Sequence, residues 1–201
     1  RFTLGRRDGR VLASDPEAHI AVVAPTRSGK TTRCVIPWLL EHTGRAIVTS
    51  TKADIVDVTR EWRERLGRVQ VWDPFGSSSA TWNPTERCAD WGASLLRAQW
   101  LADAVQEGES EIAAYWRGEA AKLLAPLLHA AALGDLPVTE LLTWVDAQDA
   151  KTPGAILAAA EAGGAKRQLD AVANLDPRNK GTTYMSAGSL LSAYRFPGIV
   201  D

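Results

Sequence analysis

Cysteine is scarce in this sequence, which has only Cys34 and Cys88 among its 201 residues. Their separation fits neither a zinc site nor a disulfide framework, so we expect free thiols in a reducing compartment. Long hydrophobic runs are also missing. The longest apolar stretch, around Leu123–Leu133, is interrupted by Pro126 and His129 and does not reach the roughly 18 residues of a membrane span. These absences argue against a disulfide-stapled protein and against a transmembrane segment within these residues.

An excess of positive charge is absent as well. The sequence has 23 Lys and Arg against 24 Asp and Glu, for a formal net charge of −1. The whole chain is therefore not a basic nucleic-acid-binding body, and contact with DNA would need a local patch or an assembly. There is no initiator methionine and no signal-peptide pattern, so we expect a soluble piece of a longer protein.

The first third of the sequence alternates strand and helix signals. A short hairpin is expected around the Asp8-Gly9 turn. His19–Ala24 is an apolar run without alternation, which is typical of a central parallel strand covered on both faces. The elements predicted from there are a strand at 19–24, a helix at 30–42, a strand at 45–49, a helix at 53–66 and a strand at 68–73. This order predicts an α/β fold with a parallel sheet and right-handed crossovers.

Beyond Trp82-Asn83-Pro84 the strand signals stop, and alanine and leucine dominate. Helices are predicted near 86–105, 110–133, 139–147, 153–162, 165–175 and 182–194. Pro126 should bend or split the second of these. The predicted organisation is a first part of a nucleotide-binding domain at 1–85, an all-α domain at 86–175, and a helix at 176–201 that returns to the nucleotide-binding domain.

A phosphate-binding loop is predicted between the first buried strand and its helix. The Ser28-Gly29 pair lets the backbone curl around an anion, and the helix that follows adds its positive end. Lys30 is the expected catalytic residue because its ammonium can reach the β- and γ-phosphates of ATP. The Thr31 hydroxyl is the expected ligand of Mg²⁺. The residues predicted to bind the nucleotide are Pro25, Thr26, Arg27, Ser28, Gly29, Lys30, Thr31 and Thr32.

This loop departs from the G-x-x-x-x-G-K-[ST] pattern at one position, where Ala24 replaces the first glycine. The alternative is a chance Gly-Lys-Thr tripeptide in a surface turn. The context of a buried strand before and a helix after favours the phosphate site. The role of Arg27 stays open between contact with the nucleotide, contact with a neighbouring subunit and exposure to solvent.

The ordered motifs resemble the coupling proteins of type IV secretion and conjugation, of the TraG/TraD type. The matching segments are Val23–Thr31, Val35–Leu40, Ile47–Asp54, Gly67–Pro74, Trp82–Pro84, Tyr115–Leu124, and Thr182–Ser186 with Leu190-Leu191 and Pro197-Gly198. The resemblance covers nearly the whole chain and implies a RecA-like P-loop core that carries a mostly α-helical inserted domain.

The resemblance also implies a function. Such proteins are hexameric ATPases, related to the FtsK/HerA translocases, at the cytoplasmic face of the bacterial plasma membrane. They recruit a relaxase–DNA complex or secreted proteins to a secretion channel. Membrane attachment would come from segments outside this chain, and DNA contact would belong to the full assembly.

Two departures limit what the chain can do alone. Ser50 stands where the family usually has Asp, and Ala53 where it has Gly. No hydrophobic run ending in Asp-Glu follows the helical block, so the carboxylates that would hold Mg²⁺ and polarise water are missing. We therefore expect weak nucleotide binding and no turnover by these residues alone. The alternative function is a non-hydrolysing receptor module whose all-α domain recognises relaxase, accessory or effector proteins.

For several groups of arginine and aromatic residues, a structural role is preferred to a binding role. The arginines at 60, 63, 65 and 68 are interleaved with acids, which favours a solvated helix face over a DNA patch. Trp116 lies on an apolar stripe, so core packing is preferred to a base-stacking role with Tyr115. Core or interface positions are likewise expected for Trp91, Trp100 and Trp144.

Overall fold

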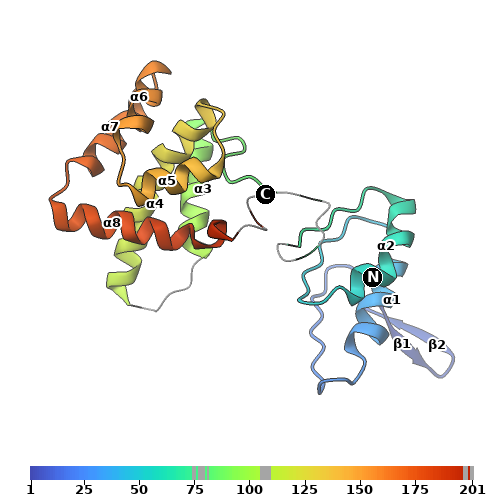
Figure 1. Ribbon diagram of the computed structural model, residues 1–201. Helices are drawn as coiled ribbons and strands as arrows, with labels where there is room; N and C mark the ends of the chain where they lie inside the picture. The colour runs from blue at the N-terminus through green and yellow to red at the C-terminus, as the bar shows by residue number, and fades with distance from the viewer. Residues whose placement is uncertain (74–75, 77–79, 81, 105–109, 197–198, 200–201) are drawn as a thin grey trace. The chain divides into compact units, whose positions relative to one another are not determined.

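The computed structural model describes residues 1–73, 76, 80, 82–104, 110–196 and 199. The chain divides into two compact units, Arg1–Trp72 and Asp73–Asp201. Figure 1 shows β1, β2, α1 and α2 in the first unit and α3 to α8 in the second. Pro197-Gly198 and the predicted helix end at 105 lie outside the described residues.

The first unit opens with an antiparallel hairpin of β1 (Thr3–Arg7) and β2 (Arg10–Ala13). Its turn residues Asp8 and Gly9 have φ of 51° and 77°. Two successive positive φ values are what a tight hairpin turn requires, and Asp-Gly supplies them at low cost. The predicted hairpin is confirmed.

The hairpin is held against the first helix by aromatic side chains. The Trp38 indole N–H donates to the Thr3 carbonyl at 2.7 Å, and the Phe2 and Trp38 ring centroids lie 5.4 Å apart. The Phe2 backbone N–H also donates to the Ser14 hydroxyl at 3.0 Å, which closes the far end of the hairpin. These contacts tie β1 and β2 to α1.

Two helices follow the hairpin in the first unit. A π-helical turn, η1 (Thr31–Val35), leads directly into α1 (Ile36–Glu41), and α2 spans Asp54–Leu66. The Ile36 N–H donates to the Thr31 carbonyl five residues back. Pro37 has no N–H and its ring would crowd the Arg33 carbonyl, so a widened turn just before it relieves the conflict. Both helices predicted in this region are confirmed.

The predicted parallel sheet is wrong. Among the described residues only the two-stranded β1–β2 sheet forms, and residues 19–24, 45–49 and 68–73 are not strands. Val23 is 96% exposed and Ile47 is 98% exposed, the opposite of buried strand positions. A parallel strand is stabilised by hydrogen bonds to neighbours distant in sequence. A short apolar run carries no signal for those partners, and this is why the RecA-like α/β fold class was a wrong prediction.

The second unit is a helical bundle. Its elements are α3 (Trp91–Ala104), α4 (Glu111–Leu133), α5 (Val138–Asp146), α6 (Lys151–Ala159), α7 (Gly163–Ala173), α8 (Pro177–Leu190) and a 3₁₀ turn, η2 (Ser192–Arg195). The central helix α4 packs against α3, α5, α6, α7 and α8. The predicted helical block is confirmed, and α4 runs through Pro126 without splitting.

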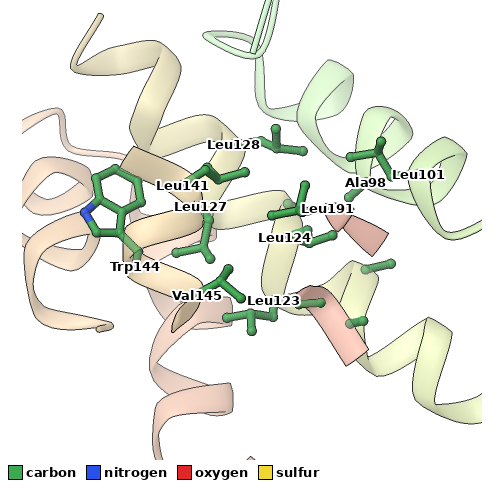
Figure 2. Close-up of a cluster of buried hydrophobic side chains, with 14 of the residues drawn as sticks. Ala98, Leu101, Leu123, Leu124, Leu127, Leu128, Leu141, Trp144, Val145 and Leu191 are labelled. Carbon is green, nitrogen blue, oxygen red and sulfur yellow. The ribbon is translucent and has the colours of Figure 1, made fainter. Parts of the chain in front are cut away.

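The core of the bundle is built mainly on α4. Figure 2 shows Leu123, Leu124, Leu127 and Leu128 on this helix, all fully buried, with Leu141, Trp144 and Val145 of α5 and Leu191 beside them. Burying a leucine stabilises a fold by about 1.5–3 kcal/mol. The helix α8 packs on α4 and α5 and lies in this second unit. The predicted boundary at residue 85 and the return of 176–201 to a nucleotide-binding domain stay predictions.

Candidate functional site

The predicted phosphate loop is a tight turn that leads into a helix. Residues 26–28 form the turn, and Arg27 has φ of 62° while Gly29 has φ of 86°. Left-handed backbone at these two positions curls the chain before the helix begins. Such curled backbone points successive N–H groups toward one side, which is the geometry of an anion-binding concavity.

Two observations favour glycine at position 29. Its positive φ strains any residue with a side chain. A Cβ there would also lie 3.2 Å from the Arg33 Cδ and 3.3 Å from the Thr32 hydroxyl. The sequence predicts that the backbone curls at the Ser28-Gly29 pair, and at Gly29 the structure agrees.

The Lys30 side chain hydrogen-bonds back to the two residues that precede the turn. Its ammonium donates to the Ala24 carbonyl at 2.6 Å and to the Pro25 carbonyl at 2.8 Å. A lysine ammonium has three donors, so one remains for an anion. The Lys30 residue is half-buried and stands at the N-cap of η1, where the helix dipole is positive.

The two threonines that follow have different surroundings. The Thr32 hydroxyl donates to the Gly29 carbonyl at 3.3 Å and braces the loop, and the Arg33 N–H donates to the same carbonyl at 2.8 Å. The half-buried Thr31 hydroxyl has no hydrogen-bond partner within the described part of the chain. The N–H groups of the first helical turn have no partners within the helix itself.

These residues fit a nucleotide triphosphate with Mg²⁺. A curled backbone, a helix N-terminus and a lysine on one short segment offer donors and positive charge to phosphate oxygens. Mg²⁺ takes most of its ligands from phosphates and water, so one threonine hydroxyl is a sufficient protein contribution. No cluster of three or more His, Cys, Asp or Glu side chains that could hold a metal ion occurs among the described residues.

A second helix braces the end of α1 far from the loop. The Arg63 guanidinium on α2 donates to the carbonyls of Leu39 at 3.5 Å and Gly44 at 2.6 Å, and also to that of His42. These carbonyls lie at and just beyond the C-terminus of α1, where backbone acceptors lack helical partners. The prediction of a solvated face was wrong for Arg63, because the spacing of the arginines does not show which one meets another helix.

The neighbouring arginines behave as predicted. Arg60 pairs with Glu64 at 2.8 Å and Arg65 pairs with Glu61 at 2.6 Å, all on exposed positions of α2. Pairs of this kind stabilise a helix by about 0.2–0.5 kcal/mol. They make a solvated, salt-bridged face on α2.

The predicted aromatic positions in the helical unit fall into two groups. Trp144 is buried in the core, and the partly buried Trp91 packs against the core cluster. Trp116 is half-buried and contacts Tyr115 edge-to-face at 5.1 Å, outside the core cluster. Trp100 is 55% exposed, beneath the Arg97 guanidinium at 5.7 Å from its ring. Core packing is therefore confirmed for Trp144 and is wrong for Trp116.

His129 and Cys88 have structural roles. The His129 Nδ1–H donates to the Cys88 carbonyl at 2.7 Å, and the Ser94 hydroxyl donates to the same oxygen at 2.7 Å. Burial raises the pKa of the Cys88 thiol, which keeps it protonated. Together these contacts dock the segment before α3 onto α4.

Among the helices that the structure describes, none combines the length and hydrophobicity needed to cross a bilayer.

Comparison with known proteins identifies the relatives of this chain. The family described as "Type IV secretory system Conjugative DNA transfer" matches residues 3–181. A conjugal transfer protein TraG of Escherichia coli is 34% identical over 85 residues, which is 40% of this chain and 13% of that protein. Protein VirD4 of Rhizobium radiobacter is 35% identical over 79 residues, which is 38% of this chain and 12% of that protein.

The matched part is thus a small share of each of these relatives. No solved structure gives a significant match. The family match nevertheless runs from residue 3 to residue 181, so it includes the predicted phosphate loop and ends within the first turns of α8. The chain therefore belongs to the type IV secretory system conjugative DNA transfer family, the coupling proteins that the sequence motifs resemble.

Proposed function

We propose that the chain binds ATP with Mg²⁺ through residues 24–32 and that the parent coupling protein uses this site to power or gate substrate transfer. The observation that carries the proposal is the loop itself, with left-handed backbone at Arg27 and Gly29 and with Lys30 at the start of a helix. In this proposal Lys30 binds the β- and γ-phosphates. Thr31 supplies one oxygen to Mg²⁺.

The chain supplies only one side of the proposed catalytic site. Hydrolysis needs a carboxylate that polarises the attacking water, and no apolar run ending in Asp-Glu is present in these residues. We propose that the parent protein provides it elsewhere and works as a homo-oligomer, a hexamer by family resemblance, at the cytoplasmic face of the plasma membrane. The transferred substrates would be relaxase-bound DNA or secreted proteins.

Steady-state ATP hydrolysis by the full-length parent protein tests this function. We expect Lys30→Ala to lower the rate by at least about tenfold, because a charge-assisted contact to phosphate contributes roughly 1.5–3 kcal/mol. Lys151→Ala, which removes an exposed lysine of the helical unit, is the matched control and should leave the rate unchanged. Hydrolysis that survives Lys30→Ala would show that the loop has another role.

A receptor role for the helical unit is a second proposal. The unit has its own buried core, centred on α4, and so can present a fixed surface to a relaxase, accessory protein or effector. Retention of a purified relaxase by the immobilised chain would support this role. Absence of retention for every secretion substrate of the parent system would count against it.

A further inference from the structure

The outward side of α3 carries large apolar side chains, although its inward side already packs on α4. The inward side chains are buried and belong to Ser94, Ala98, Leu101 and Ala102. Figure 2 shows Ala98 and Leu101 beside the leucines of the core. On the outward side Leu96 is 50% exposed and Trp100 is 55% exposed. The exposed side of an amphipathic helix is normally polar, so two large apolar residues one turn apart indicate a contact surface.

These two residues belong to a longer row along the helix. We call it the α3 stripe, and its members are Ala93, Leu96, Arg97, Trp100, Asp103 and Ala104. Their positions follow the i, i+3, i+4 and i+7 spacing, so they share one side of α3. The stripe has an apolar centre at Trp100. Arg97 lies three residues before this centre and Asp103 lies three residues after it.

The Arg97 guanidinium lies in the stripe without an anionic partner. It is 5.0 Å from the centroid of the Trp82 ring and 5.7 Å from that of the Trp100 ring. No ion pair between described residues includes Arg97. One of its terminal nitrogens is buried and has no hydrogen-bond partner. A partly buried cation in this state is unfavourable, so a carboxylate from another molecule would stabilise it.

Asp103 is the counterpart of Arg97 at the other end of the stripe. Its carboxylate is exposed and accepts a hydrogen bond from the neutral Gln99 amide at 2.8 Å. No cation pairs with it in the part of the chain that the structure describes. The stripe thus carries one positive and one negative charge, each without an opposite charge beside it, at equal distances from Trp100.

This order of charges is self-complementary. When two copies of one helix pack antiparallel about a two-fold axis, residues at equal distances before and after the axis lie level with each other. With Trp100 on the axis, Arg97 of one copy would lie level with Asp103 of the other. The rise of 1.5 Å per residue puts each pair of charges about 4.5 Å from the axis along the helix.

We propose that the α3 stripe is a self-association surface that joins two copies of this chain, with their α3 helices antiparallel. The two Trp100 rings stack at the two-fold axis, and the Arg97–Asp103 ion pair forms twice. Leu96 of each copy packs beside Ala104 of the other, whose small side chain lets the helices approach closely.

This contact goes beyond the ATP site and the receptor role proposed above. An isologous contact joins two chains and then closes, whereas a hexameric ring needs heterologous contacts between neighbours. The α3 contact is therefore additional to those of the ring.

A second copy fits the stripe better than a single-stranded nucleic acid. Single strands bind to grooves with an excess of positive charge and stack their bases on open aromatic rings. The stripe has no net charge, and the Trp82 ring beside it already has the Arg97 guanidinium at 5.0 Å and the Tyr194 ring at 5.9 Å. Tryptophan and arginine next to leucine are instead typical of the centre of protein–protein interfaces.

Sedimentation equilibrium of the whole chain tests the inference. We expect a monomer–dimer equilibrium with a dissociation constant of roughly 10–100 µM, because one helix face buries less surface than a standard interface. A reducing buffer excludes dimers linked through the free Cys34. The experiment contains no nucleotide, so failure of the ATP site does not affect it.

Removing the central aromatic ring assigns the association to the stripe. Trp100→Ala should raise the dissociation constant at least about tenfold, because tryptophan at an interface centre is a frequent hot spot. Its matched control is Tyr115→Ala, which removes a 60% exposed aromatic side chain from α4 outside the stripe and should dimerise normally. The helical content of each variant, measured by circular dichroism, shows that it is folded.

A charge exchange tests the antiparallel register. Asp103→Arg places two cations level with each other at each end of the contact and should weaken the dimer at least about fivefold. Asp57→Arg, at an exposed position of α2, makes the same change in net charge and should have no effect. Combining Asp103→Arg with Arg97→Asp restores opposite charges and should recover most of the lost affinity.

Four results would overturn the inference. One is a monomer mass up to about 1 mM chain. Another is a dimer that Trp100→Ala does not weaken, which would place the contact elsewhere. The third is a folded double variant that associates as weakly as Asp103→Arg alone. The last is dissociation of the dimer by a single-stranded oligonucleotide that binds the unmodified chain but not Trp100→Ala, which would make the stripe a nucleic-acid site.

Discussion

Single residues determine the geometry at both ends of α1. At the N-terminal side Gly29 allows the left-handed turn and Lys30 bonds back to the Ala24 and Pro25 carbonyls. At the C-terminal side the Arg63 guanidinium of α2 donates hydrogen bonds to the backbone carbonyls of His42 and Gly44. The C-terminal end of α1 is thus fixed by a cation, in the orientation that the helix dipole favours.

Removing the Arg63 side chain should loosen α1. We expect Arg63→Ala to destabilise this helix by about 1–3 kcal/mol, because it breaks charge-assisted hydrogen bonds to several carbonyls. Hydrogen exchange of the backbone amides at 33–41 measures the change directly. Arg60→Ala, which removes only the exposed pair with Glu64, should have an effect below about 0.5 kcal/mol. Equal protection in the two variants would contradict the role given to Arg63.

At the scale of helices, caps and loops explain where most elements begin. Asp176 accepts the N–H groups of Arg178 and Asn179 at the start of α8, with Pro177 in the first helical position. Asp149 does the same for α6 from just outside the helix. The Thr152 side chain holds the pKa of Asp149 below its usual range, and the backbone N–H groups of Thr152 and Lys151 act in the same direction.

The Asp149 cap predicts a pH-dependent contribution to stability. Its pKa is depressed in the folded chain, so the contribution is present above the unfolded-state pKa of about 3.9 and is lost as the pH falls through the folded value. We expect Asp149→Ala to lower the free energy of unfolding by about 1 kcal/mol at pH 7. Urea titrations at pH 7 and pH 3 measure this, and the difference from the unmodified chain should shrink at pH 3.

Asn at the same position separates the charge from the hydrogen bonds. Asp149→Asn keeps an acceptor for the backbone N–H groups but cannot titrate. It should retain part of the stability and lose the pH dependence. An identical pH dependence in Asp149→Asn and the unmodified chain would show that another group is responsible.

At the scale of the whole molecule, local signals predicted the helices and the hairpin correctly and the parallel sheet wrongly. Turn residues such as Asp8-Gly9 specify structure within a few residues, and the hairpin prediction holds. The apolar stripe predicted on α4 holds only in part, because Trp116 lies outside the core and residues 123–131 are buried in an unbroken run. The runs at 19–24 and 45–49 have the composition of buried strands, but composition does not supply the distant strands that a parallel sheet needs. The candidate phosphate loop could be proposed from the sequence because all of its residues lie in one segment.

Contacts made by packing could not be found in that way. Only the fold shows, for example, that the His129 ring meets the Cys88 carbonyl, 41 residues away in sequence. The same is true of Arg63, whose carbonyl partners lie about twenty residues away in sequence, at separations of 24, 21 and 19. Sites made by packing depend on long-range contacts, which residue patterns in one sequence do not encode visibly.

Nucleotide binding by this chain is the most direct test of the central claim, that residues 24–32 hold the phosphates of ATP. Isothermal titration with MgATP should show saturable binding of one nucleotide per chain, weakened by about ten- to a hundredfold in Lys30→Ala. Lys151→Ala should bind as the unmodified chain does. Binding of equal strength in the unmodified chain and Lys30→Ala, or no binding at millimolar MgATP by the folded chain, would contradict the claim.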